Sequence, residues 1–204
     1  MSSINEKTIL VVGCGGLGGY VLQEFARIGV KKLIFLDGDV FEESNLNRQL
    51  LSSYSKLGKS KAEVYDAFIR DISKCETEWY SSFLTDDNAD LIDKADIVID
   101  CVDTVKTRLW LAQKCEEKNK VLIHGAVEGE MGEAVICYPG KHTLQNMFKN
   151  TKENKHKTIS FNVAIISSIE VMLAYRVLTE TDDEYKNKLI ITDLESGLVN
   201  KLDI

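Results

Sequence analysis

Residues 8–18 of this 204-residue chain read TILVVGCGGLG. The run from Thr8 to Val12 is aliphatic and β-branched, which is typical of a strand buried on both faces of a parallel sheet. It passes directly into Gly13, Gly15 and Gly18, which fit the pattern G-x-G-x-x-G between a strand and a helix. Such glycines permit a tight turn and close approach of a phosphate to the backbone, and the helix N-terminus adds partial positive charge. The stretch therefore predicts a nucleotide site.

The chain beyond this turn alternates between helical and strand patterns. Tyr20 to Ile28 has apolar residues at helical spacing, Gly29 is placed as its C-cap, and Lys32 to Leu36 is typical of a second strand. Further helices are expected at Lys59 to Ile72, Asp86 to Lys94 (capped by Thr85) and Lys106 to Lys118, with strands at Glu76 to Phe83, Asp96 to Cys101 and Val121 to Ile123. Repeated strand–helix units predict an α/β fold with a Rossmann-like, doubly wound and mostly parallel sheet.

The pattern changes after residue 125. The segments that follow are a strand at Glu133 to Tyr138, a lysine-rich mobile loop at Lys141 to Lys157, a long apolar helix at Ile159 to Leu178, and a hairpin of Leu189 to Thr192 with Gly197 to Val199. These segments predict a C-terminal antiparallel extension of the sheet. We expect a single domain over residues 1–204, with a nucleotide-binding half at about 1–125 and a second half at about 126–204.

The composition argues against several classes of function. The net charge is −7 and the pI is about 5.1, so the chain has no global electrostatic footprint for nucleic acid or an anionic membrane. No apolar run is expected to span a membrane, and the N-terminus lacks the features of a signal peptide, which makes a cytoplasmic location the default. The five cysteines include no C-x-x-C pair, so no zinc site is expected.

An acid is expected about 20 residues after such a glycine turn, where it hydrogen-bonds a ribose hydroxyl. Asp37, just after the second predicted strand, is that acid. The turn and the acid together fit NAD, FAD and ATP, so these two features leave the nucleotide open.

The crossover after this acid supplies the groups that separate the alternatives. Asn45, Arg48 and Lys61 follow within it, beside Asp39. Hydride transfer needs no extra cations there, whereas nucleotidyl transfer does, because charge develops on the α-phosphate and on the departing pyrophosphate. Arg48 can fork onto phosphate oxygens, and Lys61 can act as a point charge. The structural alternative is that Asn45 caps a short helix from Leu46 to Leu51 and that Arg48 pairs with a surface acid.

Five motifs, taken in order, make the chain resemble the ThiF/MoeB/HesA family, whose members are similar to ubiquitin-activating enzymes in their adenylation domain. The motifs are Gly13-Cys14-Gly15-Gly16-Leu17-Gly18, Asp37-Gly38-Asp39-Val40, Ser44-Asn45-Leu46-Asn47-Arg48-Gln49, Gly58-Lys59-Ser60-Lys61 and Asp100-Cys101-Val102-Asp103. They cover the first half of the chain closely, and Ala164 to Glu170 resembles the family's late interface helix more loosely. The short length looks most like a compact ThiF of thiamine biosynthesis.

The resemblance implies an activity, cofactors and a partner. Such proteins adenylate the C-terminal glycine carboxylate of a small ubiquitin-like sulfur carrier that ends in Gly-Gly, using ATP and magnesium. The roles implied by motif match are ribose binding for Asp37, phosphate binding for Asn45, Arg48 and Lys61, and magnesium binding for Asp103. The other implied nucleotide-binding positions are Gly13, Gly15, Gly16, Gly18, Asp39, Ser44 and Gln49. Catalysis is expected from Arg48, Lys61 and Asp103 without a general base, because the carboxylate is already a nucleophile.

Asp103 can serve in two ways by its position. It follows an expected central strand, and a carboxylate at the C-terminal end of such a strand faces the ligand crevice of a doubly wound sheet. The same position permits an N-cap for the helix from Val105 to Lys118. Arg108, one turn further on, either orients Asp103 or lies on the surface. His124, at the end of a buried strand, is interpreted as a satisfied core histidine.

The chain departs from the family pattern in three respects. No arginine precedes the first strand, so a trans-acting arginine from that segment is missing. The paired C-x-x-C motifs for zinc are also missing, and the loop at 141–157 has no cysteine for a covalent carrier intermediate. Cys137 is nearest to that loop and is interpreted as core. We therefore expect adenylation without a covalent carrier intermediate on this chain.

Two other functions stay open. A non-catalytic member of the family would bind nucleotide and a ubiquitin-like protein without turnover, and the missing arginine favours it. A NAD-dependent oxidoreductase could use the same fold. The apolar helix from Ile159 to Leu178 also predicts a homodimer, since one domain of this size can hardly cover it all round. The sequence leaves the carrier and its pathway open.

Overall fold

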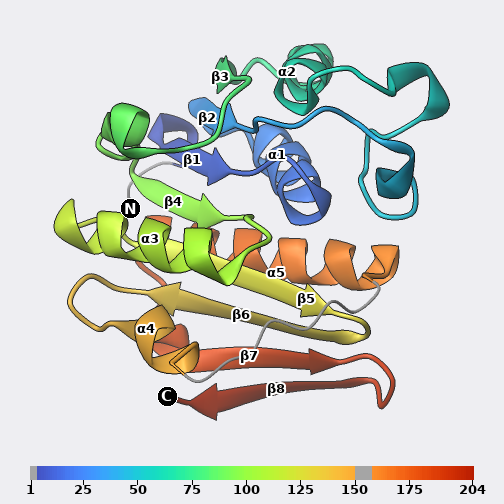
Figure 1. Ribbon diagram of the computed structural model, residues 1–204. Coiled ribbons are helices and arrows are strands. Elements are labelled where there is room, and N and C mark those ends of the chain that lie inside the picture. The colour runs from blue at the N-terminus through green and yellow to red at the C-terminus, as the bar shows by residue number, and fades with distance from the viewer. Residues whose placement is uncertain (1–3, 150–157) are drawn as a thin grey trace.

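The computed structural model describes residues 4–149 and 158–204, and it joins eight strands in one sheet (Figure 1). The strands are β1 (Thr8–Val12), β2 (Lys32–Leu36), β3 (Glu76–Tyr80), β4 (Ile97–Asp100), β5 (Leu122–Glu128), β6 (Met131–Cys137), β7 (Lys188–Asp193) and β8 (Leu198–Asp203). They lie in the order β3-β2-β1-β4-β5-β6-β7-β8. The strands β1 to β5 pair in parallel, and β6, β7 and β8 extend the sheet in antiparallel fashion. The predicted doubly wound sheet and its C-terminal extension are confirmed.

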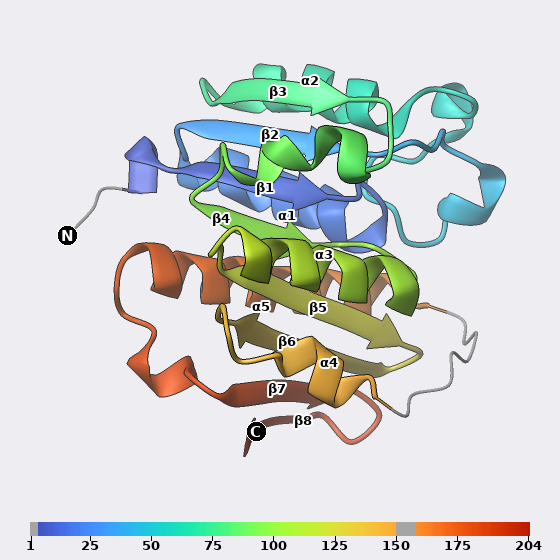
Figure 2. The same ribbon diagram turned by 60° about the vertical axis from the view of Figure 1, so that its left-hand side comes forward.

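Helices cover both faces of this sheet. The α-helices are α1 (Gly16–Ile28), α2 (Lys61–Ile72), α3 (Val105–Glu117), α4 (Thr143–Met147) and α5 (Ser160–Leu178). Short 3₁₀ helices occupy Ile4–Glu6, Glu43–Asn45, Tyr54–Lys56, Asp86–Ile92 and Asp183–Tyr185. Figures 1 and 2 show α1 and α5 on one face and α3 and α4 on the other. The central strands are therefore enclosed on both sides.

The central strands read as continuous apolar runs because both of their faces are buried. On β1, Ile9 and Val11 pack into the core shared with α1, α2 and α5. Leu10 and Val12 point the other way and pack into the core shared with α3. Each such side chain stabilises the fold by about 1.5–3 kcal/mol relative to an exposed one. This burial fixes the carboxyl edge of β1, where the glycine turn begins.

The boundaries of the N-terminal elements differ slightly from the predictions. Helix α1 begins at Gly16 rather than Tyr20, because the last glycines of the turn are wound into its first turn. It ends at Ile28, and Gly29, with a φ of 84°, is the left-handed C-cap that was predicted. The segment Asp86–Ile92 is a 3₁₀ helix, shorter than predicted, and the side chain of Thr85 caps it as expected.

The structure differs from the predictions at one helix and at the end of one strand after residue 120. Residues predicted as loop from Lys141 form helix α4, whose Leu144 is fully buried against the sheet. The rest of that predicted loop, 150–157, lies outside the described residues. Strand β5 continues past Ile123 to Glu128, because it pairs with β6 in a hairpin around Gly129. The predicted closing hairpin of β7 and β8 is confirmed.

Helix α5 is long and apolar enough, by length and composition, to cross a membrane. The expectation that no apolar run reaches that length is therefore wrong. Half of its most apolar window, 50%, is buried inside the fold, and the helix packs on α1, β5 and β6. Core helices of globular folds can also reach this length and apolar composition, and α5 packs against the sheet as such a helix.

Candidate functional site

The glycine turn joins the carboxyl edge of β1 directly to α1. Gly13 has a φ of +96°, and its N–H donates to the carbonyl of Leu36 at 3.0 Å. A Cβ on Gly13 would lie 2.6 Å from the carbonyl oxygen of Cys101, and a Cβ on Gly18 would lie 1.9 Å from the carbonyl oxygen of Gly13. Only glycine allows backbone to approach backbone this closely. The turn is therefore packed against the ends of both neighbouring strands, β2 and β4.

Gly18→Ala is expected to destabilise the turn strongly. The added methyl group would meet the Gly13 carbonyl, which is backbone and cannot swing aside. We expect a loss of about 3 kcal/mol in the free energy of unfolding, at the upper end of typical overpacking, with loss of ATP binding. Urea unfolding and calorimetric ATP titration measure both. The matched control is Gly15→Ala, whose Cβ would meet only Gln49 Nε2 at 3.7 Å. Equal stability of the two variants would contradict this account.

Asp37 lies at the end of β2 and ties that strand to the glycine turn. Its Oδ2 accepts from the N–H of Cys14 at 2.7 Å, and its Oδ1 accepts from the N–H of Asp39 at 2.8 Å. Burial raises the pKa of Asp37, while those two N–H groups and Lys61 favour its ionised form. Each carboxylate oxygen keeps a second lone pair, so Asp37 can still accept from a ribose hydroxyl. Ribose binding by Asp37 stays a prediction.

Lys61 begins α2 and points its ammonium group into the crossover. The residue is only 5% exposed, and its Nζ lies 3.2 Å from Asp39 Oδ2. The backbone N–H of Lys61 donates to the Asp39 carbonyl at 3.2 Å, so the two residues are joined twice. An ammonium group has three donors, and this pairing uses one. The structure thus brings together two predicted site residues and leaves Lys61 able to contact a phosphate.

Arg48 lies beside the start of α1, at the glycine turn. Its Cγ is 3.9 Å from a Cβ position on Gly16. Its Nη1 donates to the Ser44 carbonyl and to Asn47 Oδ1, both at 2.9 Å. Within residues 4–149 and 158–204, no carboxylate forms an ion pair with Arg48, so the alternative in which Arg48 pairs with a surface acid is wrong. The guanidinium has further donors for an anionic ligand.

Gln49 also faces the glycine turn. It is buried, and its Nε2 lies 3.7 Å from a Cβ position on Gly15. Its Oε1 has no hydrogen-bond partner in the described part of the chain. A buried amide oxygen without a partner is costly, which is consistent with a group that a ligand completes.

Ser44 and Asn45 shape the segment that carries Arg48. Asn45 Oδ1 accepts from the N–H of Glu42 at 3.0 Å, and its Nδ2 donates to Ser44 Oγ at 3.3 Å. The first of these bonds belongs to a capping box around the 3₁₀ helix Glu43–Asn45. The structural alternative, in which Asn45 caps a helix from Leu46 to Leu51, is wrong, because turns occupy that segment. Phosphate binding by Asn45 stays a prediction.

Asp103 lies in the loop between β4 and α3, and it is exposed. The N-cap of α3 is Thr104, whose Oγ1 accepts from the N–H of Thr107 at 3.3 Å, so the capping role considered for Asp103 is wrong. The loop packs on the glycine turn through Cys101, whose carbonyl is the atom that a Cβ on Gly13 would strike. Asp103 is therefore on the same edge of the sheet as Gly13.

The donor set at this edge fits magnesium better than a metal held by the protein alone. The described residues contain no group of three or more His, Cys, Asp or Glu side chains that could hold a metal ion. Magnesium is usually bound by one or two carboxylates together with substrate phosphates and waters. Asp103 can supply such a single carboxylate beside a nucleotide.

The cysteines are all buried, and none forms a disulfide. Burial raises the pKa of the Cys137 thiol well above its ordinary value, and burial does the same for Cys14 in the glycine turn. A thiol must ionise to act as a nucleophile. The core role predicted for Cys137 therefore fits its environment.

A buried charged cluster lies beneath the Asp103 loop, and sequence patterns found it only in part. Asp100 and His124 are register partners on β4 and β5, and His124 Nδ1 lies 2.9 Å from Asp100 Oδ2. Arg108 is 6% exposed, so the predicted surface alternative is wrong. Its Nε lies 3.3 Å from Asp100 Oδ2, and Glu133 Oε1 is 3.4 Å from His124 Nε2. His124 is a satisfied core histidine, as predicted.

The charges of this cluster stabilise one another. Burial opposes ionisation of Asp100, but Arg108 and His124 outweigh it and hold the pKa of Asp100 below its usual range. The same two partners lower the pKa of Glu133 against its own burial. The sequence signal that could have revealed the cluster is a polar residue closing an apolar run on each of two neighbouring strands.

Glu170 of α5 is a buried carboxyl group near this cluster. A Cβ on Gly125 would lie 2.4 Å from Glu170 Cδ, so β5 needs glycine there. Neither carboxylate oxygen of Glu170 has a hydrogen-bond partner in the described residues. Burial raises its pKa well above the ordinary value, and the nearby charge of Asp100 adds to the shift. Burial without a hydrogen-bond partner therefore favours the protonated, neutral form of Glu170.

Glu170→Gln is expected to flatten the pH dependence of stability. The folded state keeps a proton that the unfolded state releases above the ordinary value of 4.5. The stability from that proton is complete below the unfolded value, and it is lost at about 1.4 kcal/mol per pH unit as pH rises toward the folded pKa. Urea unfolding of both proteins between about pH 5 and 7 should show wild type losing stability relative to the variant. The control variant Glu63→Gln changes an exposed residue and should follow wild type across this pH range. If the stability of Glu170→Gln also changed with pH in parallel with wild type, the result would contradict this account.

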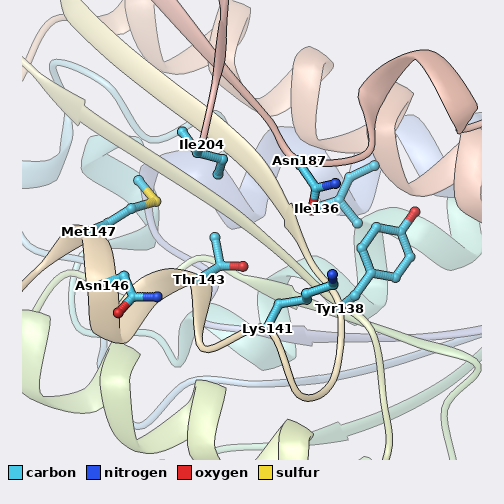
Figure 3. Close-up of a pocket in the computed structure, with 8 residues that line it drawn as sticks. All are labelled: Ile136, Tyr138, Lys141, Thr143, Asn146, Met147, Asn187 and Ile204. Carbon is cyan, nitrogen blue, oxygen red and sulfur yellow. The ribbon is translucent and has the colours of Figure 1, made fainter.

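A cavity of about 470 Å³ lies elsewhere, between the end of β6, α4 and the end of β8 (Figure 3). Its lining residues are Ile136, Tyr138, Lys141, Thr143, Asn146, Met147, Asn187 and Ile204. The Tyr138 hydroxyl donates to Asp182. None of the predicted nucleotide-binding residues lines this cavity. The candidate nucleotide site therefore lies at the carboxyl edge of the sheet and not in this cavity.

Comparison with known proteins identifies the family. The family model described as ThiF family matches residues 1–204. The chain is 29% identical over 217 aligned positions to the adenylyltransferase and sulfurtransferase MOCS3 of Drosophila yakuba, covering 98% of this chain and 47% of that protein. It is 32% identical over 150 positions to the SAMP-activating enzyme E1 of Haloferax volcanii, covering 72% and 56%. The chain thus spans about half the length of the curated relatives it matches.

Solved structures agree on the fold. A crystal structure of Escherichia coli MccB with ATP matches with a TM-score of 0.81 at 19% identity, over 98% of this chain and 64% of that chain. At this identity the likeness establishes the Rossmann-like fold alone. Because the family model matches from the first residue to the last, the chain belongs to the ThiF family.

Proposed function

We propose that this chain adenylates the C-terminal glycine carboxylate of a small ubiquitin-like sulfur carrier, consuming ATP and releasing pyrophosphate. One observation carries the proposal: three segments meet at the carboxyl edge of the sheet. They are the glycine turn after β1, the crossover that holds Arg48 and Lys61, and the loop that holds Asp103. Relatives named as an adenylyltransferase and as a SAMP-activating E1 support it, as does a similar fold crystallised with ATP.

The nucleotide would lie across the glycine turn, with its phosphates at the N-terminus of α1. Ligands of doubly wound sheets bind at this edge, where the strand order reverses between β1 and β4. Asp37 would accept from the ribose, and Arg48 and Lys61 would reach the phosphates from the crossover. A hydroxyl group of the nucleotide's sugar would donate a hydrogen bond to Gln49 Oε1, which has no partner among the described residues.

The chemistry is an in-line displacement at phosphorus. A carboxylate oxygen of the carrier would attack the α-phosphorus of ATP and form a new O–P bond. The bond from that phosphorus to the bridging oxygen of pyrophosphate breaks, and the pyrophosphate leaves with the electron pair. Arg48 and Lys61 stabilise the charge that develops on the phosphate oxygens. Asp103 would hold magnesium, which neutralises phosphate charge when bound.

ATP–pyrophosphate exchange tests the proposal directly. The purified chain is assayed with a panel of small proteins that end in Gly-Gly, and with the same proteins lacking those last two residues. We expect exchange that requires magnesium and an intact carrier tail. The member of the panel that supports exchange identifies the pathway, for which the resemblance to compact ThiF favours thiamine biosynthesis. We also infer a cytoplasmic location, which cell fractionation would test.

The same assay separates the two alternatives. Binding of ATP and a carrier without exchange would favour a non-catalytic member of the family. Tighter binding of NADH than of magnesium–ATP would favour an oxidoreductase. The cations Arg48 and Lys61 and the acid Asp103 at one edge favour the transferase, because hydride transfer has no use for them.

A homodimer is the assembly that the surface of α5 favours. Phe161, Ile165 and Tyr175 are 49%, 37% and 39% exposed on this one helix. A shallow hollow of about 420 Å³ beside them is lined by Ala164, Ile165, Ser168, Ile169 and Met172. Light scattering is expected to give about 46 kDa, twice the chain mass of 22.9 kDa. A monomeric mass at micromolar concentration would contradict the dimer, and Ile165→Asp should produce one.

A further inference from the structure

Arg108 connects the Asp103 loop to three separate elements. It lies in the first turn of α3, and its Nη2 donates to the Val102 carbonyl at 2.7 Å. Its Nη1 lies 3.2 Å from His124 Nε2 on β5, and its Nε lies 3.3 Å from Asp100 Oδ2 on β4. The guanidinium also lies over the ring of Phe148, at the C-terminal end of α4, 5.6 Å from the ring centre.

These contacts fix both backbone polar groups of the residue before Asp103. The N–H of Val102 donates to Asp100 Oδ1 at 3.2 Å, while its carbonyl accepts from Arg108. His124 completes the arrangement, because its Nδ1 lies 2.9 Å from Asp100 Oδ2 while its Nε2 lies beside both Arg108 Nη1, at 3.2 Å, and Glu133 Oε1, at 3.4 Å. The loop is thereby held between a buried carboxylate and a buried guanidinium.

We propose that Arg108 is a positioning residue for the reaction, acting through the Val102 carbonyl to place the Asp103 carboxylate at the nucleotide. This inference rests on the proposed function. A loop held in place loses little conformational freedom when Asp103 engages a metal–phosphate group, whereas a loose loop must be ordered at that step. Removing the Arg108 contacts should therefore weaken the magnesium-dependent part of nucleotide binding. It should spare binding by the glycine turn and Asp37, which Arg108 does not touch.

Lysine is the informative replacement for Arg108. Arg108→Lys keeps a positive charge for Asp100, so the buried pair is retained and the chain should fold. A lysine cannot form the fork that reaches Val102 and His124 together. Arg108→Met removes the charge as well. Changes of this kind around a metal ligand commonly cost about 10- to 100-fold in metal affinity or activity.

The experiment measures ATP affinity by calorimetry, in EDTA and across a magnesium titration, for wild type and both variants. For Arg108→Lys we expect the magnesium midpoint to rise about 10- to 100-fold, with ATP affinity in EDTA unchanged. Exchange should show the same shift in magnesium dependence. Two controls accompany it. Arg70→Met removes an exposed arginine of α2, and Leu111→Ala lowers stability through the buried face of α3; neither should move the midpoint.

The possible results distinguish failure of the proposed adenylation function from failure of the positioning role of Arg108. A wild-type chain that shows no exchange with any carrier would count against the proposed function, whatever Arg108 does. A folded Arg108→Lys variant with the wild-type magnesium midpoint would overturn the positioning role. Failure of both Arg108 variants to fold would also overturn it, because it would assign Arg108 to stability. A midpoint that moves equally in Leu111→Ala would likewise reduce the effect to stability.

Discussion

Arg48→Ala is expected to lower carrier-dependent ATP–pyrophosphate exchange by about 10²- to 10³-fold, the usual cost of removing a group that stabilises developing charge. The charge on the phosphate oxygens is greatest in the transition state, so the loss should fall on the rate more than on ATP affinity. The fold should be little affected, because Arg48 contacts the exposed residues Ser44 and Asn47. Steady-state exchange and thermal unfolding measure the two effects.

Two further variants sharpen this test. Arg27→Ala removes an exposed arginine from the opposite end of α1 and should leave exchange unchanged. Arg48→Lys keeps a positive charge but loses the fork, so its rate should lie between wild type and Arg48→Ala. A rate for Arg48→Ala within twofold of wild type would remove Arg48 from the mechanism.

Asp103→Ala is expected to cause a loss of similar or greater size, with a higher magnesium requirement. Charge stabilisation by a bound metal is worth several kcal/mol, which corresponds to about 10²- to 10³-fold or more in rate. Thr104 rather than Asp103 caps α3, so the helix should keep its N-terminus and the midpoint of unfolding should move little. Exchange measured across a magnesium titration gives both the rate and the requirement.

The control for this variant is Asp71→Asn, an exposed acid on α2 away from the sheet edge. It removes the same charge from the chain without touching the loop after β4. We expect it to match wild type at every magnesium concentration. If Asp103→Ala did so too, the metal-binding role of Asp103 would be lost, although the nucleotide site itself could stand.

The parts of the fold predicted well from sequence are those set by neighbouring residues. The β1 run, the glycine turn and the left-handed cap at Gly29 follow from local periodicity and backbone sterics. Helix α4 does not, because its short pattern becomes helical only where Leu144 finds a buried place against the sheet. The extension of β5 likewise depends on its partner β6 rather than on its own sequence.

The site shows the same division between local and distant effects. Asp37 follows from its spacing to the turn, but its hydrogen bond to Cys14 depends on the β1–β2 pairing. Adjacent residues Asp103 and Thr104 can both cap a helix, and only the observed backbone decides between them. Burial of Arg108 on α3 could not be predicted, because its charged and polar partners Asp100 and His124 lie on strands β4 and β5.

A structure with a non-hydrolysable ATP analogue and magnesium tests the central claim most directly. We expect the phosphates over the glycine turn, the ribose on Asp37, Arg48 and Lys61 on phosphate oxygens, and the metal on Asp103. An analogue bound elsewhere, or one bound at the turn with the Arg48 guanidinium directed into solvent, would contradict the account.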